Sequence, residues 1–287
     1  MKAIYQVAGI SKQACQQYRI RQLHKGVAAF KFFDQADRIR KDHPRAGCRK
    51  MALDLCCSGW GRDKTEQLLL SNGYRLQYPR NYARTTYSQQ HLLYPNLIEG
   101  LELTGINQLV QTDITYFRVR ERFYYIVFLI DVYSRRIVGY AVNKTLEAQG
   151  NIKALRMMFN TRQDRCLTSL IHHSDRGSQY IDTVYRKMLT DKGIIISMCK
   201  EAWQNAYTER VNRTIKEEYL NEWKIENYQE LTRSVAKAVK HYNNKRKHQA
   251  LGYISPIDFE KQPDRVTMKL YKSSENPTQN GWVDSRK

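Results

Sequence analysis

The chain has 287 residues and carries 48 Lys and Arg against 28 Asp and Glu, which gives a formal net charge of +20 at pH 7. This positive excess predicts a polyanionic partner such as DNA, RNA or an acidic membrane surface. No stretch approaches the apolar length needed to cross a bilayer and the first residues lack the apolar core of a secretory signal, so we expect a soluble, cytoplasmic protein with no membrane partner.

The first 74 residues predict short helices separated by glycine and proline. Gly9 predicts a turn and Ser11 a cap for a helix that ends at Arg19, an arrangement that resembles a helix-turn-helix. A plain helical hairpin explains the same pattern equally well. We therefore expect residues 1–74 to be a helical, helix-turn-helix-like DNA-binding region.

Three further helices are expected in this region. They are Ala36–Lys41, which ends before His43-Pro44, then Cys48–Leu55, which has an apolar stripe, and Lys64–Leu70, which is closed by Asn72-Gly73. Arg45, Arg49 and Lys50 place three cations near the turn after the first of these helices. They are candidates for contacts with DNA phosphates, although a solvated charged face would have the same composition.

Residues 75–104 predict a basic, tyrosine-rich linker. Arg75, Arg80 and Arg84 alternate with tyrosines, and Pro79 and Pro95 interrupt any regular element. Such a pattern suits a segment that follows a nucleic-acid strand, but tyrosine-rich linkers also pack on neighbouring domains.

Strand-like patterns begin near residue 107 and alternate with helical ones. The predicted elements are strands at Leu109–Val119, Phe123–Val132 and Arg136–Val142, a helix at Leu146–Met158, a strand at Thr168–His173, a helix at Thr183–Lys192, a strand at Ile194–Met198 and a helix at Gln204–Trp223. This order predicts an α/β domain with a mixed five-stranded sheet over residues 105–260. Residues 261–287 predict a polar C-terminal tail.

Three acidic residues occupy informative places in these elements. Asp113 lies within the first strand, Asp175 just after the fourth and Glu209 on the helix after the fifth. If the first and fourth strands are neighbours, Asp113 and Asp175 meet, and the helix can bring Glu209 towards them. Each acid also has an ordinary structural explanation, and Asp131 and Glu201 are alternatives to Asp113 and Glu209.

The ligand chemistry of such a cluster favours a hard divalent cation. Carboxylates and substrate phosphates suit Mg²⁺ or Mn²⁺, and two such ions can promote an in-line displacement at phosphorus. The six cysteines form no Cys-x-x-Cys pair and have no regularly spaced histidines, which argues against a zinc site and favours reduced thiols.

Several longer motifs resemble one known family. They are Gln111–Tyr116, the run from His173 to Tyr180, Asn205-Ala206, Glu209–Asn212 with Lys216, the run from Tyr242 to Pro256, His43–Arg45, and Tyr94–Asn96. The chain is similar to integrase-like DDE transposases of bacterial insertion sequences, of the second-reading-frame (OrfB) type, which are related to retroviral integrases. The resemblance covers nearly the whole chain.

This resemblance implies a fold, a chemistry and partners. It implies a ribonuclease-H-like fold, the catalytic and metal-binding triad Asp113, Asp175 and Glu209, and two Mg²⁺ or Mn²⁺ ions. It implies a DNA transposase that cleaves the ends of its element and joins them to target DNA, with Lys216, Arg210, Arg213 and Asn212 contacting the DNA. It also implies a homo-oligomer and a partner, or a fusion, from a first reading frame. A ribonuclease-H-like nuclease on another substrate and a catalytically decayed DNA-binding remnant or regulator are the alternatives.

Two features depart from the family pattern. Residues 176 to 208, 33 in all, separate Asp175 from Glu209, a slightly shorter interval than in most relatives, and Lys200–Trp203 is the expected site of the shortening. No heptad run of useful length is evident, which favours a separate partner that supplies a coiled coil.

Overall fold

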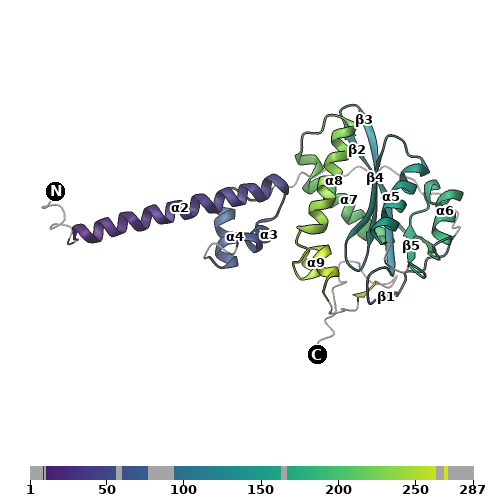
Figure 1. The fold of residues 1–287 in the computed structure, drawn as a ribbon, viewed down its shortest axis with the longest axis horizontal. Helices are drawn as coiled ribbons and strands as arrows, with labels where there is room; N and C mark the ends of the chain where they lie inside the picture. The colour runs from purple at the N-terminus through teal and green to yellow at the C-terminus, as the bar shows by residue number, and fades with distance from the viewer. Residues whose placement is uncertain are drawn as a thin grey trace. The chain divides into compact units, whose positions relative to one another are not determined.

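The computed structural model describes residues 9, 11–55, 60–76, 94–162, 167–262 and 268–270. Clustering of contacts divides the chain into two compact units, Met1–Pro79 and Arg80–Lys287, whose elements are labelled in Figure 1. Most of the predicted linker and tail, including Arg80, Arg84 and residues 271–287, lies outside the described residues. No helix in the described part is both long enough and apolar enough to span a membrane.

The N-terminal unit is helical, but its first helix is much longer than predicted. Helix α2 runs without interruption over Lys12–Asp42, so the predictions of a helix ending at Arg19 and of a separate one at Ala36–Lys41 were wrong. Residues 20–42 contain no proline and a single glycine, Gly26, whose cost of about 1 kcal/mol does not end a helix. The predicted cap is present, because the Ser11 hydroxyl accepts a hydrogen bond from the Ala14 amide at 3.0 Å.

The core of this unit lies at the C-terminal end of α2. Helices α3 (Cys48–Leu55) and α4 (Arg62–Ser71) pack there, and Phe32 and Ala36 are the buried residues of α2. The earlier part of α2 leaves large apolar side chains exposed, among them Leu23 at 69% and Phe30 at 75%. Nothing in the described part of the chain covers this stretch of helix.

The second unit contains the predicted mixed sheet. Its strands are β2 (Leu109–Val119), β3 (Arg122–Asp131), β4 (Ile137–Asn143), β5 (Ile171–Ser174) and β6 (Ile195–Met198). Their order is β4-β3-β2-β5-β6, with β3 antiparallel to both β2 and β4, and β5 parallel to both β2 and β6. The predicted ribonuclease-H-like fold class is thereby confirmed.

Two helical layers cover the two faces of this sheet (Figure 1). Helices α5 (Ala148–Thr161) and α6 (Thr183–Thr190) pack on one face, where Val127 and Leu129 point. Helices α7 (Ala206–Glu218) and α8 (Tyr228–Asn244) pack on the other face, where Ile126 and Phe128 point. Because side chains alternate along a strand, neighbouring residues of β3 serve both cores.

The remaining elements are short. They are β1 (Glu102–Leu103), α9 (Pro256–Glu260), β7 (Met268–Lys269) and the 3-10 turns η2 (Ser178–Tyr180), η3 (Ala202–Asn205), η4 (Leu220–Glu222) and η5 (Gln249–Leu251). Strand β7 pairs antiparallel with β1 although it lies in the predicted polar tail, and the side chain of Met268 is buried. This part of the tail is therefore held on the second unit by apolar contacts.

Candidate active site

The three predicted acids come from three adjacent elements of the second unit. Asp113 lies within β2, Asp175 directly follows β5, and Glu209 stands in the first turn of α7. Strands β2 and β5 are parallel neighbours, as the convergence of Asp113 and Asp175 requires, and their pairing covers Leu109–Gln111. Beyond this pairing, β2 continues to Asp113 and the chain leads from β5 to Asp175.

Asp113 has the most perturbed carboxyl group of the three acids. Burial, together with the negative charges of Asp175 and Glu209, raises the pKa of Asp113 to about 8, although Lys216 and a backbone hydrogen bond oppose the change. Burial also raises the pKa of Asp175, although its carboxylate accepts a hydrogen bond from the Gly177 amide at 3.0 Å. Adjacent carboxylates with raised pKa values in one place are typical of a functional site.

The turn after Asp175 needs glycine at one position. A Cβ atom on Gly177 would lie 2.8 Å from Oε1 of Gln179 and 3.0 Å from Oδ1 of Asp175. The absence of a side chain there lets the backbone amide approach the carboxylate. The limited space beside Asp175 and Gln179 thus explains why a glycine at this position of the His-Ser-Asp-Arg-Gly motif fits well.

Helix α7 presents Glu209, Arg213 and Lys216 along one side, since residues three, four and seven apart share a helix face. Glu209, Arg210 and Arg213 are exposed, whereas Lys216 is half-buried with its Nζ 5.5 Å from the centre of the Tyr116 ring. Burial lowers the pKa of Lys216, and Asp113 opposes this effect. Two of the predicted DNA contacts of α7, Arg213 and Lys216, thus border the acids.

Asn212 differs from the other predicted DNA-contacting residues. It is buried, and its Nδ2 donates a hydrogen bond of 2.7 Å to Oδ2 of Asp113. Its Oδ1 is also buried and has no hydrogen-bond partner. This geometry favours a role beside Asp113 over a contact with DNA.

The donor chemistry of these residues fits a hard divalent cation, although no group of three His, Cys, Asp or Glu side chains in the described part is close enough to hold one. No described residue forms an ion pair with Asp113 or Asp175, and the cation that acts on Asp113 is Lys216. The pKa of about 8 reflects burial first and the negative charges of Asp175 and Glu209 second, and a bound cation would offset those charges.

The two alternative acids are engaged elsewhere. Asp131 accepts hydrogen bonds from the Asn107 amide at 2.8 Å and the Ser134 amide at 3.0 Å, and it pairs with Arg162 at 3.4 Å. The Glu201 side chain caps η3 in a capping box with Gln204. Both acids thus have structural roles.

The predicted basic residues of the N-terminal unit lie together. Arg45 occupies the turn between α2 and α3, and Arg49 and Lys50 stand in the first turn of α3. They belong to the first unit, whereas the acids belong to the second.

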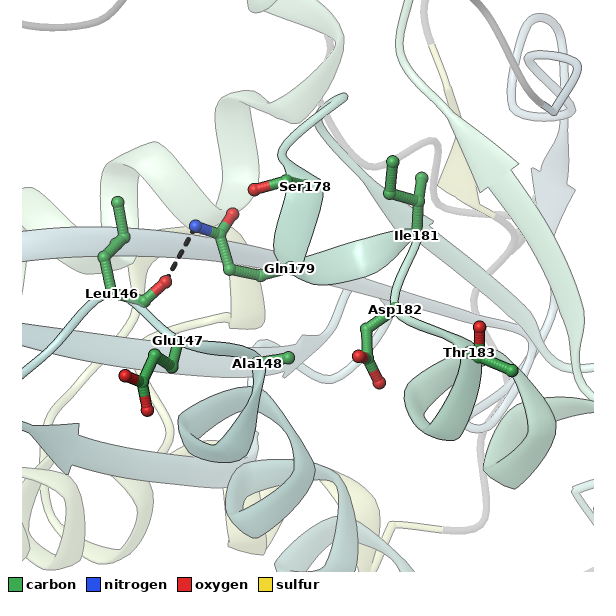
Figure 2. Close-up of a pocket in the computed structure, with 8 residues that line it drawn as sticks. All are labelled: Leu146, Glu147, Ala148, Ser178, Gln179, Ile181, Asp182 and Thr183. Carbon is green, nitrogen blue, oxygen red and sulfur yellow. Dashed lines mark hydrogen bonds between the residues drawn. The ribbon is translucent and has the colours of Figure 1, made fainter.

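A surface pocket lies beside the turn that follows Asp175 (Figure 2). It is lined by Leu146, Glu147, Ala148, Ser178, Gln179, Ile181, Asp182 and Thr183. Gln179 crosses it and donates to the Leu146 carbonyl at 2.9 Å. None of the three predicted catalytic acids lines this pocket.

The motif between Tyr242 and Pro256 has structural contacts that the sequence did not reveal. The Asn243 side chain bonds both the amide and the carbonyl of Ile137, at 2.9 and 2.8 Å. Arg246 forms a two-pronged ion pair with Glu218 in the last turn of α7, at 2.6 and 2.5 Å. The motif therefore fastens α8 to β4 and to the end of α7.

Comparisons with known proteins agree with this geometry. The profile of the integrase core domain family matches residues 104–202, and a second integrase core domain profile matches residues 193–256. The chain is 33% identical to the insertion element IS600 uncharacterized 31 kDa protein of Shigella sonnei, over 74% of this chain and 80% of that protein. It is 34% identical to the transposase for insertion sequence element IS904 of Lactococcus lactis, over 67% of this chain and 76% of that protein.

Among solved structures, the HTLV-2 integrase catalytic core domain in complex with magnesium matches with a TM-score of 0.45 and 18% identity. This match covers 57% of the present chain and 100% of that chain.

Proposed function

Because the chain belongs to the insertion-sequence transposases with an integrase core domain, we propose that Asp113, Asp175 and Glu209 are its catalytic carboxylates. The reaction is cleavage of the DNA at the ends of the element, followed by transfer of the freed 3′-hydroxyl to target DNA. The observation that carries this proposal is the parallel pairing of β2 with β5, which directs Asp113 and Asp175 to one place, together with the 2.7 Å hydrogen bond from Asn212 on the helix of Glu209 to Asp113.

Members of this family depend on metal ions, and we propose that this chain uses two Mg²⁺ or Mn²⁺ ions. Asp113 and Asp175 would hold them, and Glu209 would complete one ligand set. The bound ions would supply an activated water and offset negative charge at the reacting phosphate. Asn212 orients the Asp113 carboxylate, because its amide binds one carboxylate oxygen.

The DNA contacts divide between the two units. Arg213 and Lys216 border the acids, and together with Arg210 on the same helix they would bind phosphates close to the cleaved bond. Arg45, Arg49 and Lys50 would bind phosphates further along the DNA. We accordingly assign residues 1–74 to a DNA-binding region, 75–104 to a linker, 105–260 to the catalytic domain and 261–287 to the tail.

We also propose that the transposase acts as a homo-oligomer, alone or with a first-reading-frame product. The exposed apolar side chains of α2 support this part of the proposal. Ile20, Leu23, Val27 and Phe30 are spaced by three and four residues, the pattern of a helix that packs against another.

The test is a cleavage and strand-transfer assay of the full-length protein on linear DNA that carries the flanks of its gene. It is run with Mg²⁺, with and without the product of the upstream reading frame. We expect cleavage by the wild type and none by the double variant Asp113→Asn, Asp175→Asn. Cleavage by the double variant would contradict the proposed triad, and inactive wild type in both settings would favour a DNA-binding remnant.

A further inference from the structure

Side-chain amides join β2 to the segment that carries Glu209 at three successive residues. Gln111 donates to the Gln204 carbonyl at 2.9 Å, Asn205 donates to the Thr112 carbonyl at 2.9 Å, and Asn212 donates to Asp113 at 2.7 Å. These contacts link two parts of the chain more than ninety positions apart. They form the polar seam between β2 and α7.

The Asn205 bond lies where the pairing of two strands ends. The register of β2 with β5 stops at Gln111 and His173, one residue before Thr112. A buried carbonyl beyond a strand pairing needs another donor, and the Asn205 amide supplies it at the N-cap of α7. The separation of the chains beyond this point leaves room for Asp113 and Asp175.

The Asn205 side chain has only one arrangement that satisfies its neighbours. The Thr112 carbonyl can only accept, so Nδ2 must face it, while Oδ1 accepts from the Thr208 hydroxyl at 2.6 Å. Asn205 is 3% exposed and Thr208 fully buried, so water cannot replace either bond. The N-terminal end of α7 is therefore fixed relative to β2.

The short loop before α7 is held by the neighbouring residue of the seam. Oε1 of Gln204 accepts from the amides of Lys200 and Glu201 at 2.7 and 3.0 Å. This folds the loop between β6 and η3 back on Gln204. The loop between β6 and η3 is thus closed onto the seam.

We propose that Asn205 is a positioning residue that sets the place of Glu209 relative to Asp113, through the first turn of α7. The inference rests on the proposed function, because it assumes that these two carboxylates bind the same metal site. Glu209 follows Asn205 by one helical turn, so any movement of the helix start is passed directly to its carboxylate. Asn205 itself touches neither substrate nor metal.

The test measures Mn²⁺ binding to the full-length protein, by the electron paramagnetic resonance of the free ion. We expect Asn205→Ala to weaken Mn²⁺ binding about 10- to 100-fold, the usual effect of losing a residue that orients metal ligands. Cleavage should recover in part when the Mn²⁺ concentration is raised. A purely structural role for Asn205 would lower the melting temperature and leave the Mn²⁺ affinity unchanged.

Asn243→Ala is the matched control. Asn243 is also buried and also bonds the backbone of a strand, through Ile137 on β4, but it lies on α8. We expect a similar loss of melting temperature with unchanged Mn²⁺ affinity. Thr208→Val keeps the shape of the side chain and removes the hydrogen bond to Oδ1 of Asn205. It should weaken Mn²⁺ binding several-fold, and it replaces Asn205→Ala as the test if that variant does not fold.

Asp113→Asn separates this inference from the function on which it rests. The inference alone is overturned if Asp113→Asn binds Mn²⁺ weakly while folded Asn205→Ala binds it with wild-type affinity. If Asn205→Ala does not fold, wild-type affinity in Thr208→Val has the same meaning. Wild-type binding in Asp113→Asn overturns the proposed metal site, and the inference with it. Weak binding in Asp113→Asn and Asn205→Ala, with normal binding in Asn243→Ala, supports both.

Discussion

The second unit holds two pairs of carboxylates largely away from solvent, and the two pairs differ in the cations beside them. Asp131 and Glu260, the arginine-paired carboxylates, both contact Arg162, and Glu260 also contacts Arg136. Asp113 and Asp175, the unpaired carboxylates, form no ion pair with any residue in the described ranges. Carboxylates of this unit are therefore found both with and without an arginine partner.

The pKa values follow this difference at Glu260, whereas burial raises the pKa of Asp131 even though Arg162 pairs with it. Burial raises the pKa of Glu260, but the hydrogen bonds and charges of Arg162 and Arg136 outweigh it, so the net pKa is lowered. At Asp113, burial and the charge of Asp175 act in the same direction and raise the pKa to about 8. A carboxylate paired with arginine contributes to the fold, whereas one left unpaired is available to an ion.

The largest effect is expected from removing the arginine that the first pair shares. Arg162 is 4% exposed and binds both oxygens of Glu260, at 2.6 and 2.9 Å. Arg162→Met leaves Asp131 buried without its cation, so the free energy of unfolding should fall by about 3–5 kcal/mol. Urea denaturation followed by tryptophan fluorescence measures this change.

Mn²⁺ binding provides the internal control for this variant. The folded fraction of Arg162→Met should bind Mn²⁺ with wild-type affinity, because Arg162 contacts the arginine-paired carboxylates and not Asp113 or Asp175. A fully stable Arg162→Met protein would contradict the role of Arg162 in the fold. An altered Mn²⁺ affinity would show that the two pairs are not separate in function.

Sequence reasoning identified the unpaired carboxylates and missed the arginine-paired network. Asp113, Asp175 and Glu209 each stand in a run of neighbours that marks the family. The order of the elements predicted that two of them would meet if the first and fourth strands were neighbours, and β2 and β5 are neighbours. Arg162 and Glu260 are 98 positions apart, and neither lies in a local motif. Only the packing of α9 beside α8 and against the turn between β3 and β4 brings them into contact.

The long first helix shows the same limit at the level of secondary structure. The cap at Ser11 was readable because its hydroxyl and the amide it binds are three residues apart. The C-terminal end of α2 could not be predicted from the sequence, because Phe32 and Ala36 pack against α3 and α4 and no local sequence signal marks this contact. The strands were predicted well, since their apolar alternation is a local property.

The pH dependence of stability should reveal the unpaired carboxylates. Since the folded pKa of Asp113 exceeds its usual value of 3.8, the folded state binds this proton more tightly than the unfolded state. The contribution of Asp113 to stability is then present at acid pH and lost as the pH rises towards about 8. Without metal, Asp113→Asn should therefore become more stable than the wild type between about pH 5 and pH 9, by up to about 3 kcal/mol.

Melting curves of the wild type and Asp113→Asn, recorded in a chelating buffer across this range, measure the difference. Glu260→Gln is the comparison, because Arg162 and Arg136 hold the pKa of Glu260 below its usual value. It should be less stable than the wild type at every pH in the range. A gap between wild type and Asp113→Asn that stays constant with pH would show that Asp113 is already ionised in the folded protein.

A divalent cation should stabilise the protein through the unpaired carboxylates alone. At ten times its dissociation constant, Mn²⁺ should raise the free energy of unfolding of the wild type by about 1.4 kcal/mol. Asp113→Asn should lose most of this gain, while Arg162→Met should keep it. Equal gains in all three proteins, measured by thermal melting, would place the ion elsewhere.

The smallest effect is expected from Ser134, which joins the two arginine-paired carboxylates. Its hydroxyl lies 3.2 Å from Oδ1 of Asp131 and 2.8 Å from Oε1 of Glu260, in a fully buried position. Ser134→Ala removes this donor but leaves Arg162 and the backbone amides in place, so the free energy of unfolding should fall by only about 1 kcal/mol. The Mn²⁺-dependent gain should be unchanged, because Ser134 bonds no residue of the unpaired pair. A loss as large as that of Arg162→Met would mean that the hydroxyl, and not the arginine, holds these carboxylates in the fold.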